Sequence, residues 1–130
     1  MVDALHEARR ALRPGGTLID LRPDSSHPPR LFRGRTEVGG LSERRSAIGD
    51  NHASDRAVAR LVREGSLRRL RGGHFWYQTR YPDAAALARF VEGSLRIGGY
   101  TRGTRAALGT HPDRPILVRR ALVYGIYERR

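Results

Sequence analysis

The sequence predicts a single domain of the α/β class that spans residues 1–130. Two observations predict this class. Segments with helical apolar spacing alternate with short apolar runs of strand length, and they follow one another in the order helix, strand, helix, two strands, helix, strand. The length suits one domain, and no internal repeat or low-complexity tract divides the chain.

The first unit is a short helix followed by a strand. The helix is indicated by apolar residues that recur every three or four positions: Val2, Leu5, Ala8 and Leu12. Pro14 followed by Gly15 and Gly16 ends this helix, because proline and glycine both interrupt helical backbone. The apolar run Thr17–Leu21 then predicts a strand that is covered on both faces of its sheet.

The middle of the chain predicts a loop, a short strand and a second helix. Three prolines place residues 23–35 in a loop, residues 36–38 form a short strand, and Gly39–Gly40 turns the chain. Residues 41–51 have no clear pattern. A helix is expected from about Ala53 to Glu64, and Gly65 is a good residue to end it.

The second half predicts two strands, a third helix and a final strand. Leu67–Arg71 and His74–Tyr81 flank Gly72–Gly73, a pair that is favoured in two-residue hairpin turns. Asp83 is expected to cap the third helix. The core-facing residues of that helix are expected to be Leu87, Phe90, Val91 and Leu95. The strand after Pro115 is apolar on both faces, so it is expected inside the sheet.

Composition limits the chemistry and the location of the protein. The chain has no cysteine, which excludes disulfides and thiolate chemistry. All 25 basic residues are arginine, and the net charge is +12. This charge predicts weak, non-specific binding to nucleic acid at low salt, although exclusive use of arginine also indicates a coding bias. There is no apolar signal core and no apolar stretch long enough to span a membrane, so a cytoplasmic protein is expected.

The stretch Ala4–Asp20 resembles the segment L-x-E-x-x-R-x-L-K/R-P-G-G-x-L of class I SAM-dependent methyltransferases. In that family the segment holds a helix, the Pro-Gly-Gly turn and the fifth strand, and two more strands follow. The last of them is antiparallel and inserted between its neighbours. The resemblance therefore implies a partial Rossmann-like sheet of late strands, mixed in direction, with flanking helices. Residues 67–81 and 117–128 would supply its last two strands.

The same resemblance implies what this chain does and what it lacks. Methyltransferases of this class bind SAM with a glycine-rich loop after the first strand and an acidic residue that ends the second. Gly15–Gly16 instead follows a helix and precedes a strand, which is the wrong order for a cofactor loop. The chain then corresponds to the C-terminal half, with the SAM-binding half before Met1. It would contribute the substrate side and neither bind SAM nor catalyse methyl transfer alone.

Two groups of residues are candidates for a site. Asp20 ends a strand, where open α/β sheets place ligand sites, and with Arg22 and Asp24 it would line a substrate cleft; the alternative is a solvated strand end. A second group mixes arginines with an aromatic, as in single-strand nucleic-acid platforms: Arg68, Arg69, Arg71, Trp76 and Arg80. Core packing on one face with solvated arginines on the other explains the same residues, and it is the preferred interpretation. The alternative function is therefore a basic RNA- or DNA-binding module. The five histidines show no metal-ligand spacing.

The strand Thr17–Leu21 also predicts a partner. In the family its far side pairs with a fourth strand, which this sequence lacks. An uncovered apolar edge promotes association with other chains. We therefore expect a homodimer, strand exchange or an N-terminal partner chain at this edge.

Overall fold

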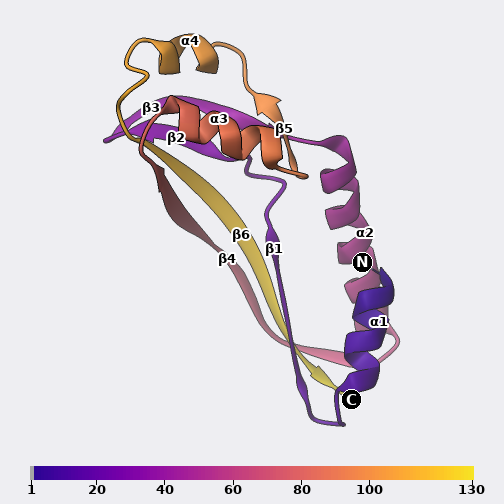
Figure 1. The fold of residues 1–130 in the computed structure, drawn as a ribbon. Coiled ribbons are helices and arrows are strands. Elements are labelled where there is room, and N and C mark those ends of the chain that lie inside the picture. Colours follow the sequence, from indigo (N-terminus) through magenta and orange to yellow (C-terminus); the bar gives the residue numbers. More distant parts are fainter. Residues whose placement is uncertain (1) are drawn as a thin grey trace.

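The computed structural model describes residues 2–130, shown in Figure 1. This part of the chain forms four helices and six strands, in the order α1 (Val2–Ala11), β1 (Thr17–Pro23), β2 (Arg30–Arg33), β3 (Thr36–Glu43), α2 (Arg45–Arg63), β4 (Leu67–Tyr81), α3 (Ala84–Gly93), β5 (Ile97–Tyr100), α4 (Thr104–Gly109) and β6 (Ile116–Arg129). The α/β class is confirmed. None of these helices is both long and apolar enough to cross a membrane.

The final strand β6 is the centre of the sheet. It pairs with β4 along its whole length, from Ile116 to Arg129. Because β4 takes one edge of β6, β1 and β2 share the other edge: β1 pairs with residues 122–128 and β2 with residues 117–119. Strands β3 and β5 extend the sheet beyond β2. The expectation of an interior last strand is therefore confirmed.

The sheet is antiparallel and not mixed. All strand pairs of the described chain are antiparallel, including β6 with both β1 and β4. The expected mixed sheet is therefore wrong for this chain. Among the paired strands only β2 and β3 are consecutive in the chain, and the two residues between them leave room for a hairpin alone, which makes this pair antiparallel.

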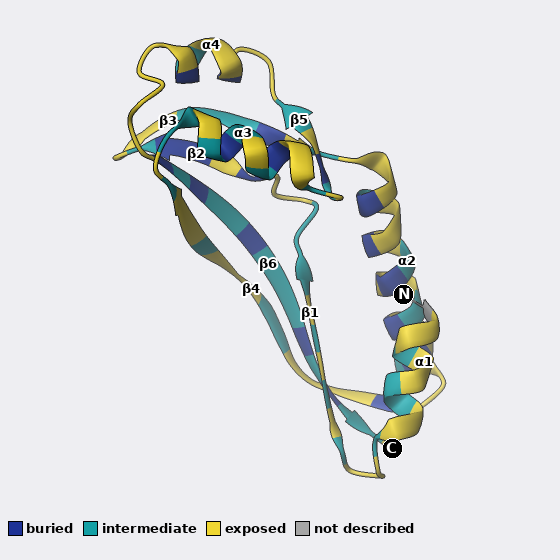
Figure 2. Cartoon of the chain, viewed as in Figure 1, coloured by how far each residue is buried: buried dark blue, intermediate teal, exposed yellow. Residues whose placement is uncertain are grey.

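Helices pack against the sheet near both of its ends, α3 near one and α2 with α1 near the other (Figure 2). Ile116 and Val118 on β6 are fully buried against α3, while Tyr127 packs against α2 at the other end of the strand. Even and odd positions of a strand point to opposite faces, so α3 lies on one face and α2 on the other. The helix α1 packs with α2, through Leu5. The molecule thus has two small cores joined by long strands.

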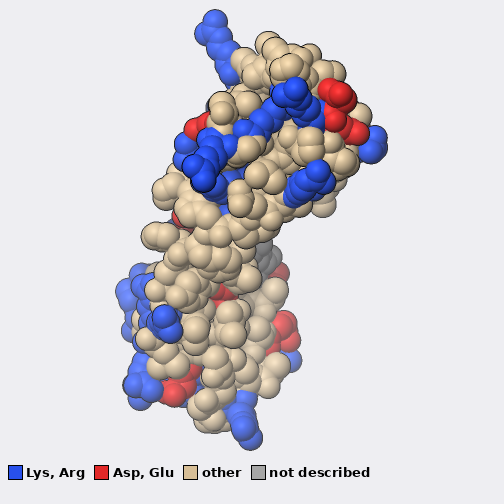
Figure 3. Space-filling view, turned by 90° about the vertical axis from the view of Figure 1, so that its left-hand side faces the viewer, with Lys and Arg blue, Asp and Glu red and all other residues tan. Residues whose placement is uncertain are grey.

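One half of one face has no helical cover. It carries the even positions of β6 from Leu122 to Ile126 and their neighbours on β1 and β4. Ile19, paired with Ile126, is 65% exposed, Leu21 is 54% exposed and Phe75 is 44% exposed. The expectation that Thr17–Leu21 is covered on both faces is wrong, because α1 and α2 both lie on the opposite face. Seen from that side, arginines gather at the two ends of the molecule, and few charged side chains lie between them (Figure 3).

The strand β4 is continuous, so the predicted hairpin at Gly72–Gly73 is wrong. Gly72 pairs with Gly125 and Gly73 pairs with Tyr124, and the only irregularity of this ladder is a register shift between Arg69 and Arg71. The glycines serve packing instead of a turn: a Cβ on Gly73 would lie 3.2 Å from the ring of Tyr124.

Helix ends follow their sequence signals closely. Asp83 caps α3 by accepting a hydrogen bond of 2.8 Å from the Ala86 amide. Gly65 has φ of +72° and ends α2 as expected, with the paired backbone hydrogen bonds that a left-handed glycine allows. The start of α2 differs, since it begins at Arg45 within the unassigned segment. Leu95 is 89% exposed and does not face the core.

The predicted turn at Gly39–Gly40 is also wrong, because both residues lie inside β3. Gly39 has φ of +155°, beside a register shift in the pairing of β2 with β3. A Cβ there would lie 2.1 Å from the hydroxyl oxygen of Thr104. Glycine at this position therefore lets α4 approach β3.

Candidate functional site

Asp20 and Arg22 lie inside β1, which continues to Pro23, so the prediction that Asp20 ends its strand is wrong; Asp24 begins the loop that follows. The structure brings Asp20 and Arg22 together, and Asp24 belongs to a separate group of contacts in the loop. The contacts of Arg22 lie next to those of Asp24. The two sets differ in how accessible their side chains are to a ligand.

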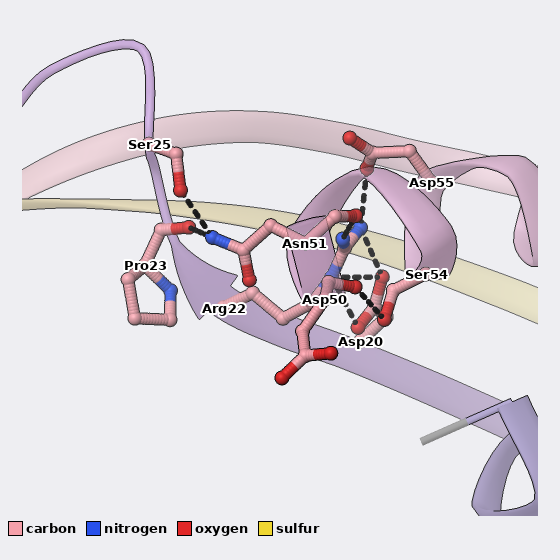
Figure 4. A network of polar contacts seen from close by, with 8 residues as sticks. All are labelled: Asp20, Arg22, Pro23, Ser25, Asp50, Asn51, Ser54 and Asp55. Carbon is pink, nitrogen blue, oxygen red and sulfur yellow. Dashed lines mark hydrogen bonds and ion pairs between the residues drawn. The ribbon is translucent and has the colours of Figure 1, made fainter. Parts of the chain in front are cut away.

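Arg22 joins β1 to α2 (Figure 4). Its guanidinium donates to both carboxylate oxygens of Asp20 at 3.0 Å, to the backbone carbonyl of Asn51 at 2.9 Å and to Asp55 at 2.7 Å. Burial acts to lower the pKa of Arg22, but the hydrogen bonds and charges of Asp20 and Asp55 raise it on balance. The side chains of Arg22 and Asp20 are only 12% and 18% exposed. This group therefore holds β1 on the helix and offers little surface to a ligand.

A second set of contacts anchors the loop after β1 to the same helix (Figure 4). The side-chain amide of Asn51 donates to the Pro23 carbonyl at 3.0 Å and to the hydroxyl of Ser25. Ser25 in turn donates to Glu43 at the end of β3, at 2.8 Å. Asn51 is 5% exposed, so these hydrogen bonds are shielded from water. The loop therefore has a defined position relative to β3 and α2.

Asp24 organises the turn that follows. Its carboxylate accepts a hydrogen bond of 2.9 Å from the Ser26 amide and lies 2.9 Å from Nδ1 of His27. Burial acts to raise the pKa of Asp24, but the hydrogen bonds and the charge of His27 outweigh it and lower the pKa. The His27 ring meets the indole of Trp76 edge-on, with ring centroids 5.7 Å apart and planes at 79°. Asp24 thus sets the orientation of an imidazole beside the chain's one tryptophan.

A pocket of about 420 Å³ opens beside these two rings. Its lining includes Pro28 and Pro29 from the loop, the backbone of Gly39 and Gly40 on β3, and the side chains of His27 and Trp76. Arg30 and Glu37 also border the pocket, and they form an ion pair with each other. The pocket therefore combines apolar walls with the imidazole of His27, the Arg30–Glu37 ion pair and the hydroxyl-bearing residues Ser26 and Thr101.

The arginines suggested for polyanion binding do not form one surface. Arg68 and Arg71 point to one face of β4 and Arg69 to the other, as their partners on β6 show. Arg68 also pairs with Glu128 at 3.0 Å. From Arg68 to Arg80 the strand is about 40 Å long at roughly 3.3 Å per residue. Trp76, the aromatic of the set, contacts His27. The structure therefore disperses this group.

The contact between His27 and Trp76 was not predicted from the sequence. The sequence predicted no role for His27, which is one of five histidines without metal-ligand spacing, and it grouped Trp76 with arginines. The available signal was the spacing Asp24-x-x-His27 in a proline-rich turn, which brings a carboxylate to an imidazole. The described residues hold no group of three or more His, Asp or Glu side chains arranged for a metal ion.

The chain has no match among known proteins in three comparisons. No protein-family model matches it, and neither a curated protein nor a solved structure matches it.

Proposed function

We propose that this chain supplies the substrate-side half of a SAM-dependent methyltransferase domain. The observation that carries the proposal is the strand order β1–β6–β4, in which the last strand lies antiparallel between two strands that precede it in the chain. This is the arrangement that the resemblance of Ala4–Asp20 implies for the strands after the Pro-Gly-Gly turn.

The turn itself supports the proposal through its role in the fold. Gly15 has φ of +77°, and a Cβ on Gly16 would lie 2.8 Å from the carbonyl oxygen of Arg13. The Gly15 amide donates to the Arg129 carbonyl at 2.8 Å, and the Arg129 amide donates to the Gly16 carbonyl at 2.9 Å. The two glycines therefore reverse the chain from α1 into β1 and tie β1 to the end of β6.

We place SAM binding outside the described residues, because they contain no cofactor loop of the methyltransferase kind. A methyltransferase cofactor loop joins a strand to a helix and is rich in glycine. The strand-to-helix connections of the described chain precede α2, α3 and α4, and none contains more than one glycine. We therefore assign SAM binding to a polypeptide segment outside these residues and derive no step through SAM here.

The edge of β1 is the surface that suits this SAM-binding segment. In the described chain β1 pairs with β6 alone, and Ile19 and Leu21 are exposed next to its free edge. The charges of Asp20 and Arg22 on β1 cancel. The free edge of β4 instead carries four arginines and no acidic residue, and charged edges discourage pairing. A strand along β1, with a helix over Ile19 and Leu21, would extend the sheet and cover its bare face.

The test compares SAM binding with and without the polypeptide encoded immediately upstream of this chain. The chain is purified alone and after co-expression with that polypeptide, and SAM is titrated into each sample by calorimetry. We expect binding by the complex and none by the chain alone. Micromolar binding of SAM by the chain alone would overturn the proposal, and so would a stable homodimer that excludes the upstream polypeptide.

A further inference from the structure

The pocket beside His27 and Trp76 has the size and lining of a small-molecule site. Its volume of about 420 Å³ lies within the usual range for ligand pockets. Trp76 is 40% exposed although it is the largest aromatic side chain of the molecule. Its indole and the rings of Pro28 and Pro29 are rigid apolar surfaces on the pocket wall. Such surfaces favour a flat, apolar ligand body, because contact with them costs little conformational freedom.

His27 is the polar lining residue on which the orientation of a ligand would depend, because the Thr101 hydroxyl, also in the lining, already bonds to Gly40 and Thr104. Its Nδ1 faces the Asp24 carboxylate at 2.9 Å, so in the neutral ring Nδ1 carries the proton and Nε2 is the acceptor. In the described chain no hydrogen bond is made by Nε2 of His27. A ligand hydroxyl that donates to this nitrogen would satisfy it.

The charges around the pocket indicate a neutral ligand. The Arg30 guanidinium and the Glu37 carboxylate bind each other, so their charges are compensated. The Asp24 carboxylate is likewise occupied by His27 and the Ser26 amide. No unpaired charge of the pocket lining therefore calls for an anionic or cationic ligand.

We propose that this pocket binds a neutral aromatic ring bearing a hydroxyl group, with the ring against Trp76 and the hydroxyl donating to Nε2 of His27. Asp24 is a positioning residue, because it acts by orienting the imidazole. The ligand class follows from the pocket itself; that this ligand is the methyl acceptor rests on the proposed function.

The test uses catechol as the probe. Binding is followed by NMR through the single indole N–H peak of Trp76 and the amide peaks of Gly39 and Gly40. We expect saturable shifts of these peaks. We also expect catechol to bind about fivefold more tightly than 1,2-dimethoxybenzene, which has the same ring without a hydroxyl donor, as for one neutral hydrogen bond. Benzoate is the anionic comparison and is expected to bind more weakly than catechol.

Two variants assign the hydrogen bond. His27→Phe keeps a ring against Trp76 but removes the acceptor, so catechol affinity should fall about fivefold while that of 1,2-dimethoxybenzene stays the same. Asp24→Asn should weaken catechol binding less, because it leaves the imidazole in place. His52→Phe, on the exposed side of α2, is the matched control and should change nothing. Equal affinity for catechol and its dimethyl ether, tighter binding of benzoate, or full affinity in a folded His27→Phe variant would overturn the proposal. None of these results depends on SAM binding.

Discussion

Arg22 on β1 and Asp55 on α2 form an ion pair of 2.7 Å that connects the edge strand to the helix beneath it. The two partners differ in burial and in the number of contacts that they make. The Arg22 side chain is 12% exposed and has three acceptors, whereas Asp55 is 60% exposed. The arginine therefore holds β1 in place, and Asp55 contributes one solvated contact.

Replacing Arg22 should destabilise the protein more than replacing either exposed neighbour. Arg22→Gln leaves the nearly buried Asp20 carboxylate without its partner, so we expect a loss of about 2 kcal/mol in the free energy of unfolding. Asp55→Asn should cost under about 1 kcal/mol, as for exposed ion pairs. Arg56→Gln, at an exposed position of α2, is the control. Urea denaturation measures all three variants, and equal losses for Arg22→Gln and Asp55→Asn would contradict this assignment.

Gly125 on β6 is required by the ring of Tyr127. A Cβ at Gly125 would lie 2.5 Å from atoms of that ring, which is buried against α2. We expect Gly125→Ala to destabilise the protein by about 1–3 kcal/mol, the usual cost of overpacking. Gly49→Ala is the matched control, because Gly49 lies inside α2 with open space around its Cα; it should stabilise by about 0.5–1 kcal/mol. Thermal unfolding of both variants decides this, and a Gly125→Ala variant as stable as the parent would contradict the packing.

Asp24 should make stability depend on acid pH. Its pKa is lower in the folded chain than the ordinary value of 3.8, because hydrogen bonds and the charge of His27 outweigh the effect of burial. The carboxylate therefore stabilises the fold above pH 3.8 and loses this contribution as pH falls through its lower folded pKa. Asp24→Asn should have a lower free energy of unfolding than the parent at pH 7. This difference in free energy should shrink as the pH falls below 3.8. Urea midpoints across pH measure it, with Asp113→Asn, exposed before β6, as the control. A difference that is constant with pH would contradict the contact.

The bare face of the sheet should be needed for docking. Ile19→Lys places a charge among the exposed apolar residues beside the free edge of β1, so it should abolish co-purification with the upstream polypeptide. Leu95→Lys is the matched control: Leu95 is 89% exposed and lies outside this face, so the complex should form normally. Loss of the complex in both variants, or in neither, would show that this face is not the docking surface.

The sequence correctly predicted the helices and helix ends that depend on residues close together in the chain. The amphipathic spacing of α1, the glycines after it, the Asp83 cap and the Gly65 stop each depend on neighbouring residues alone. The interior position of β6 was predictable because both of its faces are apolar. The helix signals hold regardless of how the strands pair.

The incorrect predictions depend on tertiary contacts. Gly72–Gly73 has the composition of a hairpin turn, but it lies opposite Gly125 and Tyr124 on β6, so the strand continues. Glycine at Gly39 accommodates Thr104, which is 65 residues away in the chain. The apolar run of β1 does not reveal that both nearby helices pack on the same face. The contact of His27 with Trp76 likewise joins a loop to a distant strand.

The measurement that bears most directly on the central claim is hydrogen exchange of the β1 amides in the complex with the upstream polypeptide. The outward-facing amides of residues 17–22 should exchange quickly in the isolated chain, because β1 has a free edge, and slowly in the complex, where a partner strand covers them. Unchanged exchange at β1, or protection that appears along β4 instead, would contradict the assignment of β1 as the edge that receives the SAM-binding half.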